Sequence, residues 1–130
     1  MTHINAFVEG IPVPQGSFRH VGGGRIIAAN PKLNAWRDTI AEQMAQQSPV
    51  RLIEARCRVE LVFMLPKPKT VSRVAPTVKP DIDKLARAVL DAISLPKYCQ
   101  ILTDDAIVTD LIASKRYTDE QPGVRVKIFW

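Results

Sequence analysis

The chain is poor in cysteine and histidine, and each shortage excludes a kind of site. Cys57 and Cys99 are its two cysteines, and neither lies in a CxxC pair or at the spacing from histidine that zinc sites use. We therefore expect packing thiols rather than a disulfide or a zinc site. His3 and His20 are isolated in the sequence, without a partner residue that would make either a general base.

Long hydrophobic runs are also missing. No apolar run approaches the ~20 residues that a membrane-spanning helix needs. The N-terminus MTHINAFVEG lacks a basic segment followed by an apolar one, so we predict neither anchoring nor secretion and expect a cytosolic protein. The 130 residues, 46% of them hydrophobic, suffice for one core, which predicts a single domain spanning residues 1–130.

Acidic residues are outnumbered by basic ones. The chain has 18 Lys and Arg against 13 Asp and Glu, for a formal net charge of +5. A basic surface of this kind favours an anionic partner, and nucleic acid is the leading candidate.

The first half of the chain alternates between apolar patterns and turn residues. Asn5 to Glu9 is predicted as a short strand, and residues 10–25 as a flexible loop rich in Gly and Pro. Asn30 and Pro31 are typical of a helix start, and helical spacing of apolar residues continues until Pro49.

Residues 54–65 alternate between apolar and charged side chains, as a half-solvated strand requires. The expected buried face consists of Ala55, Cys57, Val59, Leu61, Phe63 and Leu65.

The next fifteen residues, PKPKTVSRVAPTVKP, form a basic segment without acids. Residues 66–80 contain four prolines and four basic residues, so they cannot pack as a helix. We call them the basic arm and predict that it binds phosphate groups.

A second helix is predicted within KPDIDKLARAVLDAI, residues 79–93. Apolar residues recur there at i, i+3, i+4, i+7, i+8 and i+11, which predicts one buried face. Asp83, Arg87 and Asp91 follow one another at i, i+4 and i+8, so they form a second stripe that a ligand could reach.

The chain ends with two further strand patterns. Residues 94–103 are predicted as a connector, and Asp104-Asp105 precedes a strand over residues 106–117. A turn through residues 119–123 leads to a last alternating strand, which predicts a closing hairpin.

Four aspartates lie at the ends of these last elements: Asp81, Asp83, Asp104 and Asp105. Carboxylate oxygens are the ligands that Mg²⁺ prefers, with Mn²⁺ as a substitute, so the set predicts a metal site in a basic protein. Aspartates at helix starts are also common caps, and Asp83–Arg87 also fits an exposed ion pair, with Asp91 assigned to the same surface role.

These motifs resemble those of the RusA-like Holliday junction resolvases, crossover junction endodeoxyribonucleases common in phages and prophages. Those proteins carry a basic residue and Pro before D-x-D, a basic residue one turn into the helix, and a later DD before a strand. Here the motifs are KPDIDKLAR and LTDDAIVTD, and GIPVPQGSFRH and NPKLNAWRD extend the likeness to nearly the whole chain.

The resemblance implies catalytic roles for Asp81, Asp83 and Asp105, which would also bind the metal, with Asp104 as a further metal-binding candidate. Arg87 lies where the family has a catalytic lysine, and the permanent positive charge of its guanidinium suits an electrostatic role rather than proton transfer. Lys84 replaces the usual asparagine.

The resemblance also implies a fold and a function. The fold is α+β, a mixed, largely antiparallel sheet with two helices on one face and the acids clustered at one sheet edge, in a homodimer. The function is Mg²⁺-dependent resolution of four-way DNA junctions by paired symmetric nicks. The predicted DNA-binding residues are Lys67, Lys69, Arg73, Lys79, Lys84, Arg19, Arg25, Lys115 and Arg116. Two alternatives stay open: a non-catalytic nucleic-acid-binding protein, and a Mg²⁺-dependent nuclease of other branched DNA or of RNA.

Overall fold

The protein is a two-layer α+β domain with one main sheet and two helices. The computed structural model describes residues 2–16, 18–21, 25–28, 32–48, 52–98 and 100–130. The elements in chain order are β1 (His3–Glu9), β2 (Phe18–Val21), β3 (Arg25–Ala28), α1 (Leu33–Gln47), β4 (Cys57–Pro66), α2 (Ile82–Ser94), the short 3-10 helix η2 (Asp105–Ile107), β5 (Val108–Thr118) and β6 (Gly123–Phe129). No helix in these described ranges is long and apolar enough to cross a membrane.

The main sheet has the strand order β1-β6-β4-β5. Strand β6 is antiparallel to both β1 and β4, whereas β5 is parallel to β4. The predicted mixed, largely antiparallel sheet is therefore confirmed. The predicted closing hairpin is wrong, because β4 lies between β5 and β6. The connection 119–122 crosses the end of β4, a step of about 10 Å between next-nearest strands that four residues can span.

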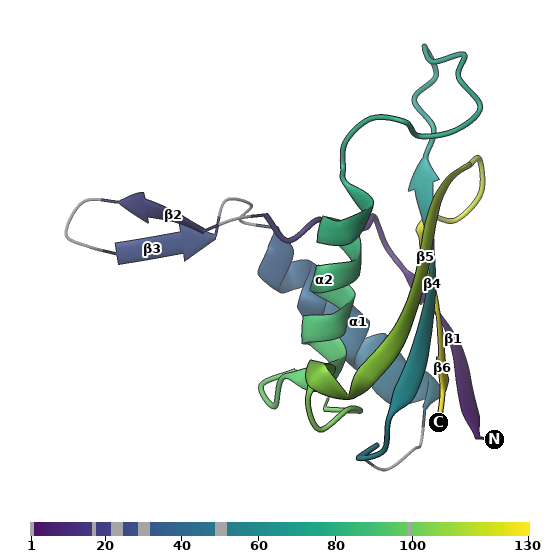
Figure 1. The fold of residues 1–130 in the computed structure, drawn as a ribbon. Helices are drawn as coiled ribbons and strands as arrows, with labels where there is room; N and C mark the ends of the chain where they lie inside the picture. The colour runs from purple at the N-terminus through teal and green to yellow at the C-terminus, as the bar shows by residue number, and fades with distance from the viewer. Residues whose placement is uncertain (1, 17, 22–24, 29–31, 49–51, 99) are drawn as a thin grey trace.

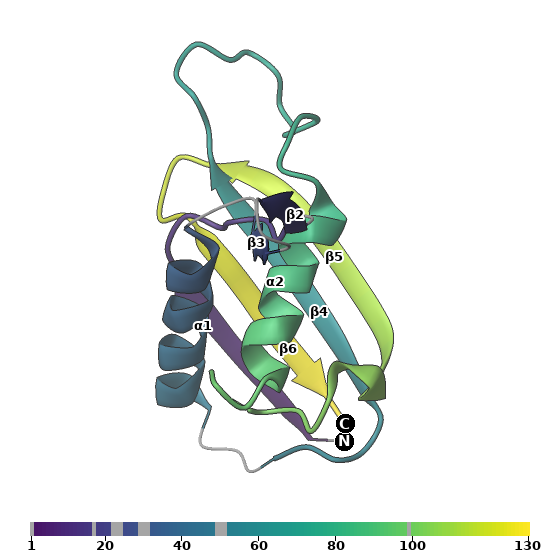
Figure 2. The same ribbon diagram turned by 90° about the vertical axis from the view of Figure 1, so that its left-hand side faces the viewer.

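Both helices cover the same face of the main sheet, as predicted (Figure 1). Seen from the helix side, α1 runs along β1, and α2 lies over the middle of the sheet (Figure 2). The buried face of β4 is formed by Cys57, Val59, Leu61, Phe63 and Leu65, which confirms the alternation except at Ala55, an exposed residue before the strand. The core lies between this face and the apolar sides of both helices.

Two local predictions in the N-terminal half need correction. Residues 10–25, expected to be a flexible loop, contain β2 and the first residue of β3, and the antiparallel pair that these strands form projects away from the sheet (Figure 1). Helix α1 begins at Leu33 with Lys32 as its N-cap, rather than with a cap at Asn30. Asn30, Pro31 and Pro49 themselves lie outside the described residues, as does Cys99.

The topology from β4 to β5 decides where the acids lie. Strand β4 leads into the basic arm at one end of the sheet, α2 returns along the sheet, and β5 then runs parallel to β4 (Figures 1 and 2). In such a crossover the helix starts at the end of the sheet where the first strand finishes, and the second strand starts at the opposite end. The N-termini of α2 and β5 are therefore on opposite ends of the molecule.

Candidate active site

The first group of acids lies at the N-terminus of α2. Asp81 is the N-cap residue, but its side chain makes no capping hydrogen bond, so capping does not explain the residue. The Lys79 ammonium lies 3.6 Å from the Asp81 carboxylate, and the Lys84 ammonium donates a hydrogen bond of 3.3 Å to Asp83. That hydrogen bond holds the pKa of the exposed Asp83 carboxyl below its ordinary value. This end of α2 exposes the side chains of both aspartates to solvent.

Lys115 attaches the end of the basic arm to this group. Its ammonium donates hydrogen bonds to the backbone oxygens of Val78, at 2.7 Å, and Pro80, at 2.8 Å. The contacts hold β5 against the residues that immediately precede Asp81. Lys115, predicted to bind DNA, thus has a positioning role in the folded chain.

The second group of acids lies at the start of β5. The Asp104 carboxylate accepts a hydrogen bond of 2.7 Å from the Ala106 amide, so Asp104 caps η2. Partial burial, followed by hydrogen bonding with Asp104 and repulsion by Asp104 and Asp91, raises the pKa of the Asp105 carboxyl. A shallow pocket lined by Asp91, Ser94, Thr103, Asp104 and Asp105, among others, lies at this end of α2. The pocket concentrates negative charge in a basic protein.

Asp91 belongs to this second group, and sequence reasoning missed it. The sequence predicts an exposed surface role for Asp91, but its side chain is 21% exposed and lies 3.1 Å from the guanidinium of Arg37, which is itself 9% exposed. Arg37 also donates a hydrogen bond to the buried Gln15. The spacing along α2 indicates that Asp91 shares a helix stripe with Asp83, so a ligand could reach it. Spacing along one helix cannot predict its partner Arg37, which lies on α1.

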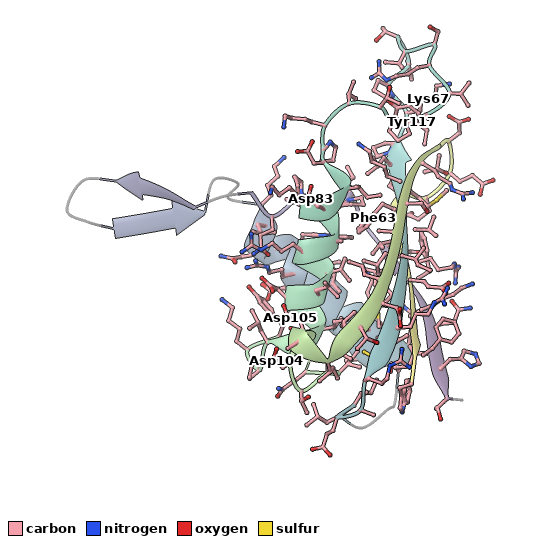
Figure 3. The ribbon with its side chains drawn as sticks, in the orientation of Figure 1. Phe63, Lys67, Asp83, Asp104, Asp105 and Tyr117 are labelled. Carbon is pink, nitrogen blue, oxygen red and sulfur yellow. The ribbon has the colours of Figure 1, made fainter. Side chains whose placement is uncertain are left out.

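The two groups lie at opposite ends of α2 (Figure 3). A helix of 13 residues is roughly 20 Å long. Across the described residues, no three His, Cys, Asp or Glu side chains come together in a way that could hold a metal ion. The expectation that Asp81, Asp83, Asp104 and Asp105 cluster at one sheet edge is therefore wrong for a single chain, because the parallel crossover separates them.

Arg87 lies between the two groups on the exposed stripe of α2. The exposed Asp83–Arg87 ion pair, one of the two interpretations of the spacing, is not formed, and the Lys84 ammonium lies 3.3 Å from the Asp83 carboxylate instead. Within the described part of the chain, Arg87 makes neither an ion pair nor a side-chain hydrogen bond. Its guanidinium is free to contact a phosphate.

The other predicted DNA-binding residues lie on several separate surfaces of the molecule. Lys67 and Lys69 lie on the basic arm, which extends beyond the end of the sheet (Figure 3). The Arg73 guanidinium bonds with the hydroxyl of Tyr117 at 2.9 Å, which ties the arm to β5. Arg116 is paired with Met64 and faces the opposite side of the sheet from Lys115. Arg19 lies in β2, and Arg25 is the first residue of β3.

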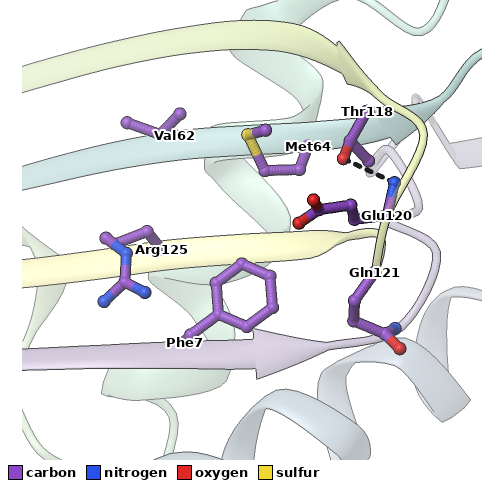
Figure 4. Close-up of a pocket in the computed structure, with 7 residues that line it drawn as sticks. All are labelled: Phe7, Val62, Met64, Thr118, Glu120, Gln121 and Arg125. Carbon is purple, nitrogen blue, oxygen red and sulfur yellow. Dashed lines mark hydrogen bonds between the residues drawn. The ribbon is translucent and has the colours of Figure 1, made fainter.

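A hollow on the open face of the sheet has a different chemistry (Figure 4). It is lined by Phe7, Val62, Met64, Thr118, Glu120, Gln121 and Arg125. Glu120 is the single carboxylate in the lining, and its backbone amide donates a hydrogen bond of 3.0 Å to the Thr118 hydroxyl. One carboxylate with an apolar surround makes this hollow a poor candidate for metal-assisted hydrolysis.

Comparison with known proteins decides the family. The model of the RusA endodeoxyribonuclease family matches residues 9–129. The chain belongs to the RusA family. Its members are endodeoxyribonucleases that act on Holliday junctions, so the resemblance inferred from KPDIDKLAR and LTDDAIVTD is confirmed. The chain is also similar to the uncharacterized protein YqaN of Bacillus subtilis (strain 168), with 31% identity over 98% of this chain and 96% of the relative.

The match to the RusA family covers both groups of acids and the basic arm. Residues 9–129 include Asp81, Asp83, Arg87, Asp104 and Asp105. The individual catalytic and metal-binding roles of these residues stay predictions.

Proposed function

We propose that the chain is a Mg²⁺-dependent endodeoxyribonuclease that resolves four-way DNA junctions by paired, symmetric nicks. The observation that carries this proposal is the crowding of Asp105 against Asp104 and Asp91 in a member of the RusA family. Arg37 balances Asp91, so Asp104 and Asp105 remain as neighbouring carboxylates beside one pocket, which a cation can neutralise in a protein of net charge +5.

The donor groups fit a hard divalent cation. Asp81 and Asp83 at the start of α2, and Asp105 beside its other end, each offer carboxylate oxygens, the ligands that Mg²⁺ prefers and Mn²⁺ also accepts. Asp104 has one oxygen engaged by the Ala106 amide, which leaves the other free to orient a neighbour or share an ion. When bound, Mg²⁺ would supply an activated water and would neutralise charge on the phosphate undergoing attack.

The chain's own residues hold the DNA at these acids. Arg87 contacts the scissile phosphate and balances charge there, because its guanidinium stays protonated. Lys67 and Lys69 contact phosphates away from the cut, which sets affinity and position without reading sequence. Lys84 and Lys79 lie beside Asp83 and Asp81 and offset part of their negative charge, which eases the approach of DNA phosphate. Aromatic residues make up 6% of the chain, so base stacking contributes little.

The proposed partner is branched DNA, and the proposed assembly is a homodimer. A four-way junction has near two-fold symmetry, so a two-fold dimer with two equivalent sites can cut opposing strands together. The products would be nicks with 5′-phosphate and 3′-hydroxyl ends. We place this activity in the cytoplasm, which is the bacterial host's if a phage encodes the protein.

The test is cleavage of a synthetic mobile four-way junction, with linear duplex as the substrate control. Wild type, Asp83→Asn and Asp105→Asn are compared in Mg²⁺ and in EDTA, with Asp119→Asn as a control variant that changes an acid outside both groups. We expect paired nicks that need Mg²⁺, persist in Asp119→Asn and disappear in the other two variants while junction binding remains.

Two results would contradict the proposal. Junction binding without cleavage in any divalent metal would make the protein a non-catalytic nucleic-acid-binding member of the family. Equal cleavage of junctions and of flaps or RNA would replace the junction-resolving activity by a broader nuclease activity.

A further inference from the structure

A buried cation lies beside the second group of acids, and the proposed reaction gives it no role. Arg37 lies on α1, and its side chain is 9% exposed. Its Nη2 atom donates hydrogen bonds to the side-chain oxygen of Gln15 and, at 3.1 Å, to the Asp91 carboxylate. Within the described part of the chain, its Nε atom has no hydrogen-bond partner. A buried ion pair adds little stability over an apolar pair of similar size, because desolvation offsets the attraction. Stability alone therefore does not explain Arg37.

Contacts from three other segments fix the position of the Arg37 guanidinium. Gln15 is buried in the segment after β1, and its backbone amide donates a hydrogen bond of 2.9 Å to the backbone oxygen of Lys84 on α2. Asp91 lies near the C-terminal end of α2, and the centroid of the Tyr98 ring lies 5.9 Å from the guanidinium carbon. A side chain that is held from several sides in this way keeps one orientation and also fixes its partners.

Asp91 is held through one oxygen and lines the pocket of the second group. Arg37 engages its Oδ2 atom, and no hydrogen bond from the described residues reaches its Oδ1 atom. The pocket has a volume of about 290 Å³, and Asp104 and Asp105 also line it. After burial and the contacts with Asp104, the charge of Asp91 is a further cause of the raised pKa of Asp105. Asp91 thus retains an unengaged oxygen near Asp105.

The carboxylates of this pocket do not surround one ion directly. Across the described ranges, no three acidic, histidine or cysteine side chains come close enough to hold a metal together. Mg²⁺ usually binds through one or two carboxylates and keeps several of its waters. A further carboxylate then contacts the ion through water, and such outer contacts orient the groups around the metal. The free Oδ1 atom of Asp91 suits this indirect contact.

We propose that Arg37 and Asp91 are positioning residues of the nuclease. Arg37 holds Asp91, and the Oδ1 atom of Asp91 accepts a hydrogen bond from a hydration water of the divalent cation at Asp105. The inference rests on the proposed function and adds to it two residues of the same chain. Arg37 is buried, so it acts through Asp91 rather than by contact with DNA.

Binding of Mn²⁺ to the DNA-free protein tests this role without turnover. Asp91→Asn keeps an oxygen to which Arg37 can donate, but it removes the negative charge that orients hydration water. Asp110→Asn is the matched control, because Asp110 forms an ion pair with Arg56 at an exposed position. We expect the Mn²⁺ dissociation constant, measured by electron paramagnetic resonance, to rise about tenfold in Asp91→Asn and to stay at the wild-type value in the control.

Substitutions of Arg37 test whether it acts through Asp91. Arg37→Met should lower kcat for junction cleavage about tenfold without changing KM, because Asp91 loses its fixed position while the DNA contacts remain. Arg37→Lys keeps the charge and should lose less kcat than Arg37→Met. The double variant Arg37→Met with Asp91→Asn should be no slower than the slower single variant, since the two residues act in one chain of contacts.

The outcomes separate this inference from the proposed function. A wild type that neither binds Mn²⁺ nor cuts a junction would overturn both. A wild type that does both, with Asp91→Asn binding Mn²⁺ equally tightly, would overturn the positioning role alone and leave Arg37–Asp91 as an ion pair of the fold. Additive losses of kcat in the double variant would show that Arg37 acts by another route, which also overturns the inference.

Discussion

The two ends of α2 carry the same kind of side chain in opposite electrostatic settings. At the N-terminal end, Lys84 lowers the pKa of Asp83, and Lys79 lies beside Asp81. At the other end, burial and two neighbouring carboxylates raise the pKa of Asp105. Arg37 balances Asp91, but no described lysine or arginine forms an ion pair with Asp104 or Asp105.

Asp81 and Asp83 therefore have lysines that offset their charge, whereas Asp104 and Asp105 need a cation from outside the described chain. When a metal binds Asp81 and Asp83, Lys79 and Lys84 can leave these carboxylates and contact DNA phosphate instead. The Asp105 end has an excess of negative charge that costs stability in the free protein. Such costs are common at functional sites, where chemistry rather than stability selects the residues.

The largest expected effect is a loss of activity, and it should differ between substitutions of Asp105 and of Asp104. Asp105→Asn should lower kcat/KM for junction cleavage by on the order of 10²–10³-fold, because it removes a metal ligand. Asp104→Asn should lower it by about 10-fold, since one Asp104 oxygen is engaged by the Ala106 amide and its effect on the metal is indirect. Steady-state cleavage of a labelled junction in Mg²⁺ measures both. Equal losses would show that the two aspartates are equivalent ligands.

The next effect is on stability and contrasts the cations at the two ends. Arg37→Met should lower the free energy of unfolding by about 3 kcal/mol, because it leaves the partly buried Asp91 carboxylate without its partner. Lys84→Met should leave it unchanged within the error of the measurement, since the Lys84–Asp83 pair is on the surface. Urea unfolding at neutral pH checks both variants. A small Arg37→Met effect would mean that Asp91 is neutralised by another route.

The basic arm should affect binding rather than chemistry. Lys67→Ala and Lys69→Ala should each reduce the slope of log affinity against log salt by about 1, if each lysine contacts one phosphate. Fluorescence anisotropy of a junction in Ca²⁺, a metal that allows binding without cutting in many nucleases, gives the slope. Val74→Ala on the same arm is the control, and its slope should equal that of wild type.

The smallest expected effect tests the charge crowding itself. The folded-state pKa of Asp105 is raised, so below the ordinary carboxyl pKa both folded and unfolded chains are protonated and Asp105→Asn should be neutral. As the pH rises through the raised pKa, wild type loses stability that the variant keeps. At pH 7 in EDTA the variant should be more stable by less than about 1 kcal/mol, because solvent screens this exposed group.

Thermal unfolding from pH 3 to pH 8 measures this difference, and Mg²⁺ should reverse it. A bound cation stabilises wild type and not the variant. An unchanged difference in Mg²⁺ would indicate that the Asp105 end does not bind metal.

Much of the fold followed from patterns along the chain. Period-two alternation located β4, and apolar residues at helical spacing located α2 and its buried face, because each pattern reports one side of a local element. The strand order did not follow. A sheet with β4 between β5 and β6 buries the same residues as a sheet in which β5 and β6 form a hairpin. The alternation of side chains along β5 and β6 therefore does not distinguish the two pairings. The pairing of β2 with β3 was missed because the three glycines between them in the sequence and the prolines that precede β2 are typical of a loop.

The candidate site likewise has features that the sequence predicts and features that depend on the tertiary structure. By itself the sequence determined the family to which the chain belongs, and it predicted which residues carry chemistry: the motifs KPDIDKLAR and LTDDAIVTD and the basic arm. Tertiary structure alone decided that Asp91 lies with Arg37 and Asp105, and that Asp83 and Asp105 are at opposite ends of α2. The physical reason is that spacing along a chain specifies the face of a helix or strand, whereas the distance between two elements depends on the crossover and on the edge at which the sheet stops.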